Sequence, residues 1–129
     1  MQRWPMEFPK DLFNWPTSVC VADPEQDDCP LIYVNASFCR MTEYPAVEVI
    51  GRNCRFLQGE GTDLGEVERF GRSIRGVGVG SATLLNYTKS RRPFLNAIFV
   101  QTLRTVGGAR YLLALQFDIT DAAMLREAA

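Results

Sequence analysis

The stretch GRNCRFLQGEGTD, residues 51–63, places a thiol among hydrogen-bonding and charged side chains. Cys54 stands between Asn53 and Arg55, Gln58 follows four residues later, and a glycine-rich turn comes next. Cysteines in small soluble domains are mostly apolar filling or disulfide partners, and neither use needs polar neighbours. The setting of Cys54 therefore indicates a functional site, and the remainder of the chain indicates its kind.

The composition of the 129-residue chain is that of one globular domain, with 47% hydrophobic and 22% charged residues. Its 14 basic and 15 acidic residues lack the basic excess that phosphate backbones require, so we expect no nucleic-acid partner. No apolar run approaches the ~20 residues that cross a bilayer, and the first ten residues lack the apolar stretch of a signal peptide. We expect a soluble, cytoplasmic domain without a membrane partner.

The chain has four cysteines, none in a C-x-x-C pair, and no histidine. The absence of histidine argues against a His-ligated haem, the usual zinc sites and His-based nucleophilic catalysis. We therefore expect no metal site and no enzyme of a common kind. A disulfide framework is not expected in a cytosolic domain of this size. Cys20 and Cys39 are accordingly interpreted as inert buried thiols.

Hydrophobic patterning predicts an α+β domain in which helices lie between two groups of strands. Asn35 and Asp63 are expected to cap helices, Pro45 suits a first turn, and Gly51 and Gly76 follow helix ends. Tight turns between the last three strands imply antiparallel pairing. The expected strands are 18–22, 31–34, 81–87, 93–104 and 111–119, and the expected helices begin at residues 35, 45 and 63.

Both ends of the chain are expected to flank this core. Residues 1–17 mix four aromatic residues with three prolines, which argues against one long helix and indicates a cap over the core or over a partner. We favour the cap over the core. Residues 120–129 have the pattern of a helix start, with Thr120 or Asp121 as its cap.

Three amide side chains, Asn86, Asn96 and Gln116, interrupt otherwise apolar strands. A buried amide without partners costs on the order of 1–3 kcal/mol, so these groups need hydrogen-bonding partners. Together with Asn53 and Gln58 they suggest one shared pocket. Amides offer both donors and acceptors, which suits a flat heterocycle with alternating carbonyl and N–H groups between apolar walls.

GRNCRFLQ, residues 51–58, resembles the signature of the LOV (light, oxygen or voltage) domains, the flavin-binding photoreceptor branch of the PAS fold. ADPEQDDCPLIYVN, TEYPAVEVIGRNCRFLQG, LLNYTKSRRPFLN and YLLALQF follow the family's order and spacing. The resemblance covers about residues 18–119 and is to a bacterial LOV sensor. It implies a five-stranded antiparallel sheet with short helices over one face, an N-terminal cap (1–17) and a truncated C-terminal signalling helix (120–129).

The resemblance also implies a chemistry. Cys54 would bond reversibly to flavin C4a after blue-light excitation, a reaction that needs no histidine base. Gln116 would face flavin N5 and rotate its amide when N5 gains a proton, which would signal through the last strand to a C-terminal helix or effector. That effector could be a histidine kinase in the full-length protein.

The same resemblance implies which residues hold the cofactor, expected to be FMN. Asn53 would bond the ring or ribityl chain, Gln58 would bond the ribityl side, and Arg55 would pair with the phosphate. Asn86 and Asn96 would hold the pyrimidine edge of the ring. The implied apolar walls are Leu57, Val67, Phe70, Ile74, Leu85, Ile98, Val100 and Leu112.

Three positions depart from the family pattern. Gly71 stands where many members have a second phosphate-binding Arg, and Arg72 is the tentative substitute, so riboflavin or FAD could compete with FMN. Arg69 and Arg75 are other candidates, but they are interpreted as solvated surface charges. The other two departures are Cys29, where the family usually has Asn, and Ala114, where it commonly has Gly. Cys20 matches no family site residue, but strand alternation places it on the flavin side of the sheet.

The function expected from these features is blue-light sensing by a sensory domain that is not an enzyme. Two alternatives stay open: a flavin-binding, redox-sensing PAS domain and a ligand-free PAS interaction module. A flavoenzyme is disfavoured because no acid–base pair accompanies the flavin site. The exposed sheet face and the aromatic N-terminal segment favour a homodimer.

Overall fold

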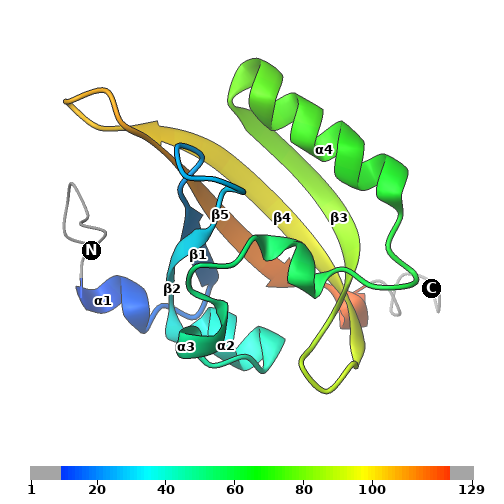
Figure 1. Ribbon diagram of the computed structural model, residues 1–129. Helices are drawn as coiled ribbons and strands as arrows, with labels where there is room; N and C mark the ends of the chain where they lie inside the picture. Colours follow the sequence, from blue (N-terminus) through cyan, green and yellow to red (C-terminus); the bar gives the residue numbers. More distant parts are fainter. Residues whose placement is uncertain (1–9, 123–129) are drawn as a thin grey trace.

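A five-stranded antiparallel sheet forms the centre of the molecule in the computed structural model, which describes residues 10–122. The strand order is β2-β1-β5-β4-β3, so the first strand pairs with the last (Figure 1). The α+β, five-stranded prediction is confirmed. The strands are β1 (Ser18–Ala22), β2 (Leu31–Val34), β3 (Val79–Tyr87), β4 (Pro93–Arg104) and β5 (Arg110–Asp118).

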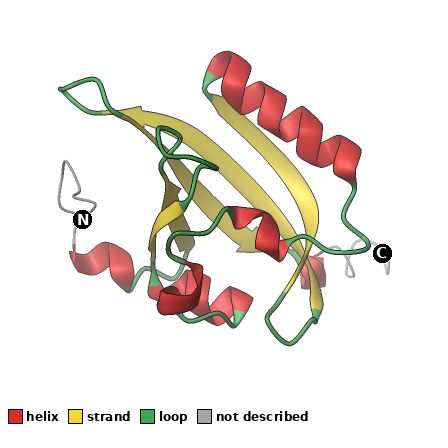
Figure 2. Cartoon of the chain, in the orientation of Figure 1, coloured by secondary structure: helices red, strands yellow, loops and turns green. Residues whose placement is uncertain are grey.

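Most helices lie between β2 and β3 in the chain; the exceptions are a short one at the start and a helical turn that begins at residue 120 after β5 (Figure 2). Asn35 and Asp63 cap α2 and α4 as predicted, because their side chains accept hydrogen bonds from Phe38 and from Gly65 and Glu66. The described helices are α1 (Lys10–Phe13), α2 (Ala36–Thr42), α3 (Ala46–Val49), the 3₁₀ helix η1 (Cys54–Leu57) and α4 (Leu64–Val77).

Element boundaries differ from the predictions at three places, the smallest being β5, which lies one residue earlier than predicted at Arg110–Asp118. Helix α4 continues through Gly76 and ends at Gly78, whose φ of +81° supplies the left-handed C-cap. Strand β3 begins directly after it at Val79, two residues earlier than predicted. The short helix η1 was not predicted, since four residues are too few to show helical periodicity.

The core lies between the sheet and the short helices. Phe38 of α2, Val49 of α3 and Leu57 of η1 are buried against Leu31, Ala82, Leu84, Ile98 and Ala114 of the sheet. Helix α4, which runs alongside β3 and β4 in Figure 1, has no fully buried residue. Its apolar side chains, Val67 and Phe70 among them, only pack against the edge of the core. This arrangement leaves space between α4 and the sheet.

The N-terminal segment is fixed to the core by one buried asparagine. The Asn35 amide donates to the Thr17 and Leu12 carbonyls at 2.8 and 3.1 Å. The aromatic rings of this segment, however, are not buried: Phe13 is 46% and Trp15 48% exposed. The prediction that these aromatics cover the core is wrong for both residues; Trp4 and Phe8 lie outside the described residues.

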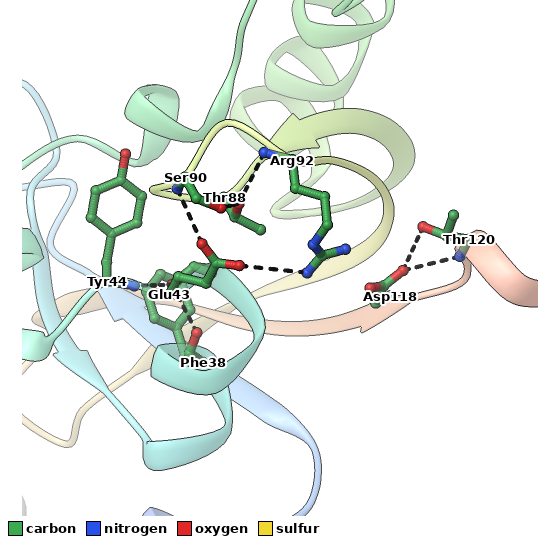
Figure 3. Close-up of polar contacts among 9 residues, drawn as sticks. Phe38, Glu43, Tyr44, Thr88, Ser90, Arg92, Asp118 and Thr120 are labelled. Atoms are coloured by element: carbon green, nitrogen blue, oxygen red, sulfur yellow. Dashed lines mark hydrogen bonds and ion pairs between the residues drawn. The ribbon is translucent and has the colours of Figure 1, made fainter.

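Polar contacts at the end of α2 hold the β3–β4 hairpin in place (Figure 3). The Glu43 carboxylate accepts a hydrogen bond from the Ser90 amide at 3.1 Å and faces the Arg92 guanidinium at 3.9 Å. The same view shows the end of β5, where the Asp118 carboxylate accepts from the Thr120 hydroxyl and amide at 2.6 and 3.0 Å. A new helix begins there at residue 120, as predicted, but the capping side chain is Asp118 and not Thr120 or Asp121, which are already helical.

Candidate functional site

A cavity of about 270 Å³ lies between the sheet, η1 and α4. This volume approaches the roughly 300–1,000 Å³ of small-molecule sites in proteins. All five strands contribute residues to its wall. The wall residues of β1, β3, β4 and β5 are even-numbered, because alternate residues of a strand share one face of the sheet. Most of the wall is apolar, and the polar groups are amides, thiols and one guanidinium.

Most predicted site residues line this cavity. Leu85 does not: Leu84 takes its place, since successive side chains of a strand point to opposite faces. Arg72 is exposed on α4 and does not line the cavity either. The predicted residues that do line it are Asn53, Cys54, Arg55, Leu57, Gln58, Val67, Phe70, Ile74, Asn86, Ile98, Val100, Leu112, Ala114 and Gln116.

The lining also contains residues to which no cofactor contact was assigned: Cys20, Ala22, Cys29, Leu31, Gly71 and Leu84. Alternation along β1 and β3 was a sufficient signal for Ala22 and Leu84, given the predicted orientations of Cys20 and Asn86. Nothing in the sequence brings Leu31 to the cavity, because its place depends on how β2 pairs with β1.

The helix η1 holds Cys54 at the cavity through contacts on both sides. The Asn53 carbonyl oxygen Oδ1 accepts from the Arg55 amide at 2.9 Å, and its Nδ2 donates to the Asp28 carbonyl at 2.8 Å. The Arg55 guanidinium also pairs with the Asp28 carboxylate. Backbone hydrogen bonds of 2.8 Å join Leu31 to the chain just before Asn53. Asn53 and Arg55 therefore position the thiol as well as lining the cavity.

Two thiols, Cys54 and Cys20, face each other at this wall. A hydrogen bond from Cys20 lowers the pKa of the Cys54 thiol, although burial acts in the opposite direction. The pKa of Cys20 is raised well above its ordinary value, first by this hydrogen bond and then by burial. Cys54 is therefore the more acidic thiol and the stronger nucleophile at neutral pH.

Two amides on neighbouring strands form the polar end of the cavity. Asn96 Nδ2 donates to Asn86 Oδ1 at 2.9 Å. Asn86 lines the cavity, whereas Asn96 lies behind it and is 0% exposed. The Asn96 carbonyl oxygen Oδ1 is buried and has no hydrogen-bond partner among residues 10–122. Such an orphaned acceptor costs about 1–3 kcal/mol, so this site fits a ligand that presents an N–H group.

The third strand amide, Gln116, lies in the middle of the sheet. It pairs with Ser18 on β1 and with Ile98 on β4. The Ser18 hydroxyl donates to its Oε1 at 3.2 Å, and the side chain is 3% exposed. Gln116 therefore connects the cavity to the strand that carries the N-terminal segment.

The basic residues of α4 differ in what they contact. Arg69 pairs with Glu66 at 2.8 Å and donates to the Ser81 carbonyl at 2.9 Å. Arg75 folds back over Gly71: a Cβ built at Gly71 would lie 2.9 Å from its Nη1 atom. Gly71 lines the cavity, so the guanidinium of Arg75 occupies the space that a side chain at position 71 would take.

A tight loop closes the cavity beside η1. A Cβ built at Gly59 would lie 2.4 Å from the Tyr87 ring, and one at Gly61 would lie 2.6 Å from Leu85 Cδ2. The Tyr87 hydroxyl also accepts a hydrogen bond from the Gly61 amide at 2.8 Å. Leu85 thus packs under this loop, which explains why it is absent from the cavity wall.

Comparison with known proteins agrees with this architecture. A family model described as a PAS domain matches residues 16–121. The solved LOV domain of the Erythrobacter litoralis EL346 blue-light-activated histidine kinase is 43% identical, with a TM-score of 0.77, over 82% of this chain and 98% of that chain. The chain belongs to the LOV branch of the PAS family. The predicted family is confirmed.

Relatives among characterised proteins are longer than this chain. Blue-light-activated histidine kinase 1 of Erythrobacter litoralis is 42% identical over 105 residues, which are 81% of this chain and 29% of the kinase. Phototropin-2 of rice (Oryza sativa subsp. japonica) is 40% identical over 102 residues, which are 78% of this chain and 11% of the phototropin. The LOV chain thus spans less than a third of either relative.

No helix within residues 10–122 is both long and apolar enough to cross a membrane. Within the same range, His, Cys, Asp and Glu side chains form no group of three or more that could hold a metal ion.

Proposed function

We propose that this LOV domain is a blue-light photoreceptor that binds FMN and bonds it reversibly through Cys54. The observations that carry the proposal are a nucleophilic thiol on the cavity wall and a buried, unpaired amide oxygen on Asn96, whose Nδ2 donates to the wall residue Asn86. The photoreceptor relatives support it, because they share the fold and 40–42% of their aligned residues with this chain.

The chain's own residues fit a flavin. Asn96 Oδ1 would accept from a ring N–H, while Asn86 and Gln116 offer further amide donors and acceptors to the polar edge. Apolar side chains from α4, such as Val67 and Phe70, would lie on one face of the ring opposite the sheet. When bound, the flavin supplies blue-light absorption and a ring carbon, C4a, that accepts the Cys54 sulfur.

The phosphate of FMN needs cationic partners at the edge of the cavity. We propose Arg55 and Arg75 in this role, with Arg75 replacing the Arg that the family has at position 71. Replacing Arg75 by Ala should weaken FMN binding about 5-fold and leave riboflavin binding unchanged, since an exposed charge pair contributes about 1 kcal/mol. Arg72→Ala is the matched control, because Arg72 is as exposed as Arg75 but lies about 100° round α4 from Gly71, at ~3.6 residues per turn, whereas Arg75 folds back over Gly71. Equal losses for both ligands would contradict the assignment.

Signal output would begin at Gln116 and leave through β5. The strand is followed by two ties to β4: the Ile119 amide donates to the Leu95 carbonyl, and the Leu95 amide donates to the Thr120 hydroxyl, both at 2.9 Å. We propose a cap at 1–17, a flavin-binding core at 18–119 and a signalling-helix start at 120–129. The match to the PAS family over residues 16–121 supports these bounds.

The partners proposed beyond the flavin are an effector and a second copy of the chain. The histidine kinases and phototropins among the relatives support a fused effector, with this domain as the sensory, non-enzymatic part. Exposed Phe99 and Phe117, whose rings meet edge to face at 5.9 Å on the outer sheet face, support a homodimer. We also propose a cytoplasmic location.

The test is an absorbance spectrum of the flavin-loaded protein before and after blue light. Loss of flavin absorbance that recovers in the dark, and that Cys54→Ala abolishes, is expected. Cys39→Ala is the control, since Cys39 does not line the cavity. Light signalling that survives Cys54→Ala would favour redox sensing, and a protein that takes up no flavin would favour a ligand-free interaction module.

A further inference from the structure

Cys20 is a second thiol on the flavin cavity wall, and the proposed photochemistry does not use it. It lies in the middle of β1, opposite Val34 of β2 and Ala114 of β5, and is 3% exposed. Cys54, at the start of η1, packs against the buried cluster that contains Cys20. Both thiols line the cavity and both are free. Thirty-four positions apart in the sequence, they meet only through the fold.

The two thiols have unequal access and acidity. Cys54 is only partly buried and is the more acidic, because Cys20 donates a hydrogen bond to it. Cys20 is held inside the core, with its proton tightly bound. Redox-sensitive cysteines combine these features: an accessible, acidic thiol reacts first, and a neighbouring thiol then resolves the oxidised product.

We propose that Cys20 and Cys54 are a redox-active pair that a peroxide converts to an intramolecular disulfide. In the first step the Cys54 thiolate sulfur attacks one peroxide oxygen, the O–O bond breaks, and hydroxide leaves. This step gives a sulfenic acid on Cys54. In the second step the Cys20 sulfur attacks the Cys54 sulfur, the S–O bond breaks, and water leaves. In total two thiols lose two electrons and two protons, and hydrogen peroxide is reduced to two waters.

The other cysteines are less suited to this role. Cys39 lies on α2 and does not line the cavity. Cys29 does line it, but the pKa of Cys54 is shifted by a hydrogen bond from Cys20 and not by Cys29, whose own pKa burial raises first and the charge of Cys54 only to a lesser degree. Cys29 is also held in the loop before β2 at a φ of +46°. Cys20 is therefore the resolving thiol that the structure assigns.

The disulfide has a functional consequence that rests on the proposed function. Once the Cys54 sulfur is bonded to Cys20, it is no longer a thiol and cannot bond flavin C4a. Oxidation would therefore switch off the light response until a reducing thiol, such as glutathione, restores the pair. The pair would let one cavity respond to light only under reducing conditions.

The disulfide itself is tested without flavin. The flavin-free protein is treated with stoichiometric hydrogen peroxide, remaining thiols are alkylated, and the protein is digested without reductant for mass spectrometry. Trypsin and cleavage at aspartate are needed together, because Cys20, Cys29 and Cys39 lie on one tryptic peptide, residues 11–40, and no aspartate lies between Asp28 and Asp63 to separate Cys54 from Cys29 and Cys39. Asp23 separates Cys20 from the other two. The expected product joins the Cys20 and Cys54 peptides and is lost in Cys20→Ser.

Two controls make the result decisive. Cys39→Ser should form the disulfide as readily as the wild type, and Cys29→Ser should also form it. A wild-type product that joins Cys54 to Cys29, or sulfinic acid on Cys54 with free Cys20, would overturn the proposal. The wild-type peptide map decides the question even if Cys20→Ser folds poorly.

Illumination separates this proposal from the proposed function. Reversible bleaching of flavin in the reduced protein but not in the oxidised protein is expected. Equal bleaching in both would overturn the redox control while the photoreceptor function stands. Absence of bleaching in the reduced protein would overturn the photoreceptor function, while the peptide map still decides whether the disulfide forms.

Discussion

Replacing Asn96 by Leu should weaken flavin binding without destabilising the flavin-free protein. The two side chains have the same branching and the same number of heavy atoms, so the change mainly replaces polar atoms by methyl groups at a fully buried position. It removes the carbonyl oxygen Oδ1, which has no partner among the described residues, and the Nδ2 group that donates to Asn86 at 2.9 Å.

The magnitudes follow from these two atoms. In the flavin-free protein, the unpaired Oδ1 costs about 1–3 kcal/mol, and the hydrogen bond to Asn86 contributes about 0.5–1.5 kcal/mol. Asn86 Oδ1 lies at the cavity wall, where water can replace its lost donor. The free energy of unfolding should therefore stay unchanged or rise by about 1 kcal/mol.

In the flavin-bound protein the same substitution is unfavourable. The ring N–H would be buried against Leu without an acceptor, which costs about 1–3 kcal/mol of binding free energy. That corresponds to a dissociation constant about 5- to 150-fold higher.

The assay is urea unfolding of flavin-free protein together with fluorescence titration by flavin. Asn35→Leu is the matched control, since Asn35 is also 0% exposed but fully paired. Its Oδ1 accepts from the Val19 and Phe38 amides, and its Nδ2 donates to two carbonyls. Asn35→Leu should destabilise the flavin-free protein by several kcal/mol, because each buried donor or acceptor that loses its partner costs about 1–3 kcal/mol.

Two results would refute the reasoning about Asn96. One is a flavin-free Asn96→Leu protein that is destabilised as strongly as Asn35→Leu, which would mean that Oδ1 is paired. The other is an unchanged flavin affinity, which would mean that no ligand donor reaches this oxygen.

Three further changes test other parts of the structure. Gly59→Ala should lower the free energy of unfolding by about 1–3 kcal/mol, because the new Cβ would lie 2.4 Å from the Tyr87 ring. Gly76→Ala is the control: no atom lies within 4 Å of its new Cβ, and the free energy of unfolding should rise by roughly 1 kcal/mol in the same urea titration. Cys29→Asn should stabilise the protein by up to about 1 kcal/mol, since Asn tolerates a φ of +46° better; thermal unfolding under reducing conditions measures this. Cys20→Val should raise the pKa of Cys54, because it removes the hydrogen-bond donor that lowers it. The thiolate fraction of Cys54 at neutral pH then falls, so alkylation of Cys54 should slow and the midpoint of its pH dependence should move upward.

The fold could be predicted from the sequence where local chemistry decides the structure. Asn35 and Asp63 cap their helices through hydrogen bonds within three residues, and β4 begins and ends where its apolar run does. The helix end was predicted less well. Both Gly76 and Gly78 can end a helix, but only Gly78 adopts a positive φ, where the hydroxyl and the amide of Thr102 on β4 both donate to its carbonyl. That contact joins residues 24 positions apart, which a local pattern does not reveal.

The candidate site was predictable as a set of residues and less so as a geometry. The amides and the apolar walls were found because they interrupt or continue strand patterns. Leu85 was chosen over Leu84 although Asn86, two residues further, already fixed which face of β3 meets the cavity. The pairing of Cys20 with Cys54 depends on how η1 docks against β1, and no spacing in the sequence encodes that contact. The position of Arg75 over Gly71 needed the helix geometry, in which residues four apart are neighbours.

Ser18 makes the location of Gln116 suitable for a switch that reaches both ends of the domain. In the present orientation the Ser18 hydroxyl donates to Gln116 Oε1. If the Gln116 amide rotates, its Nε2 group takes the place of Oε1, and the same hydroxyl can accept instead of donate. The Ser18–Gln116 hydrogen bond exists in both orientations, so the two states can lie close in free energy. Ser18 directly follows Thr17, whose carbonyl is bonded to Asn35, while Gln116 lies two residues before the cap at Asp118. Rotation of the Gln116 amide can therefore affect two segments. Hydrogen bonds connect Gln116 to the segment before β1, and the chain itself connects it to the helix after β5.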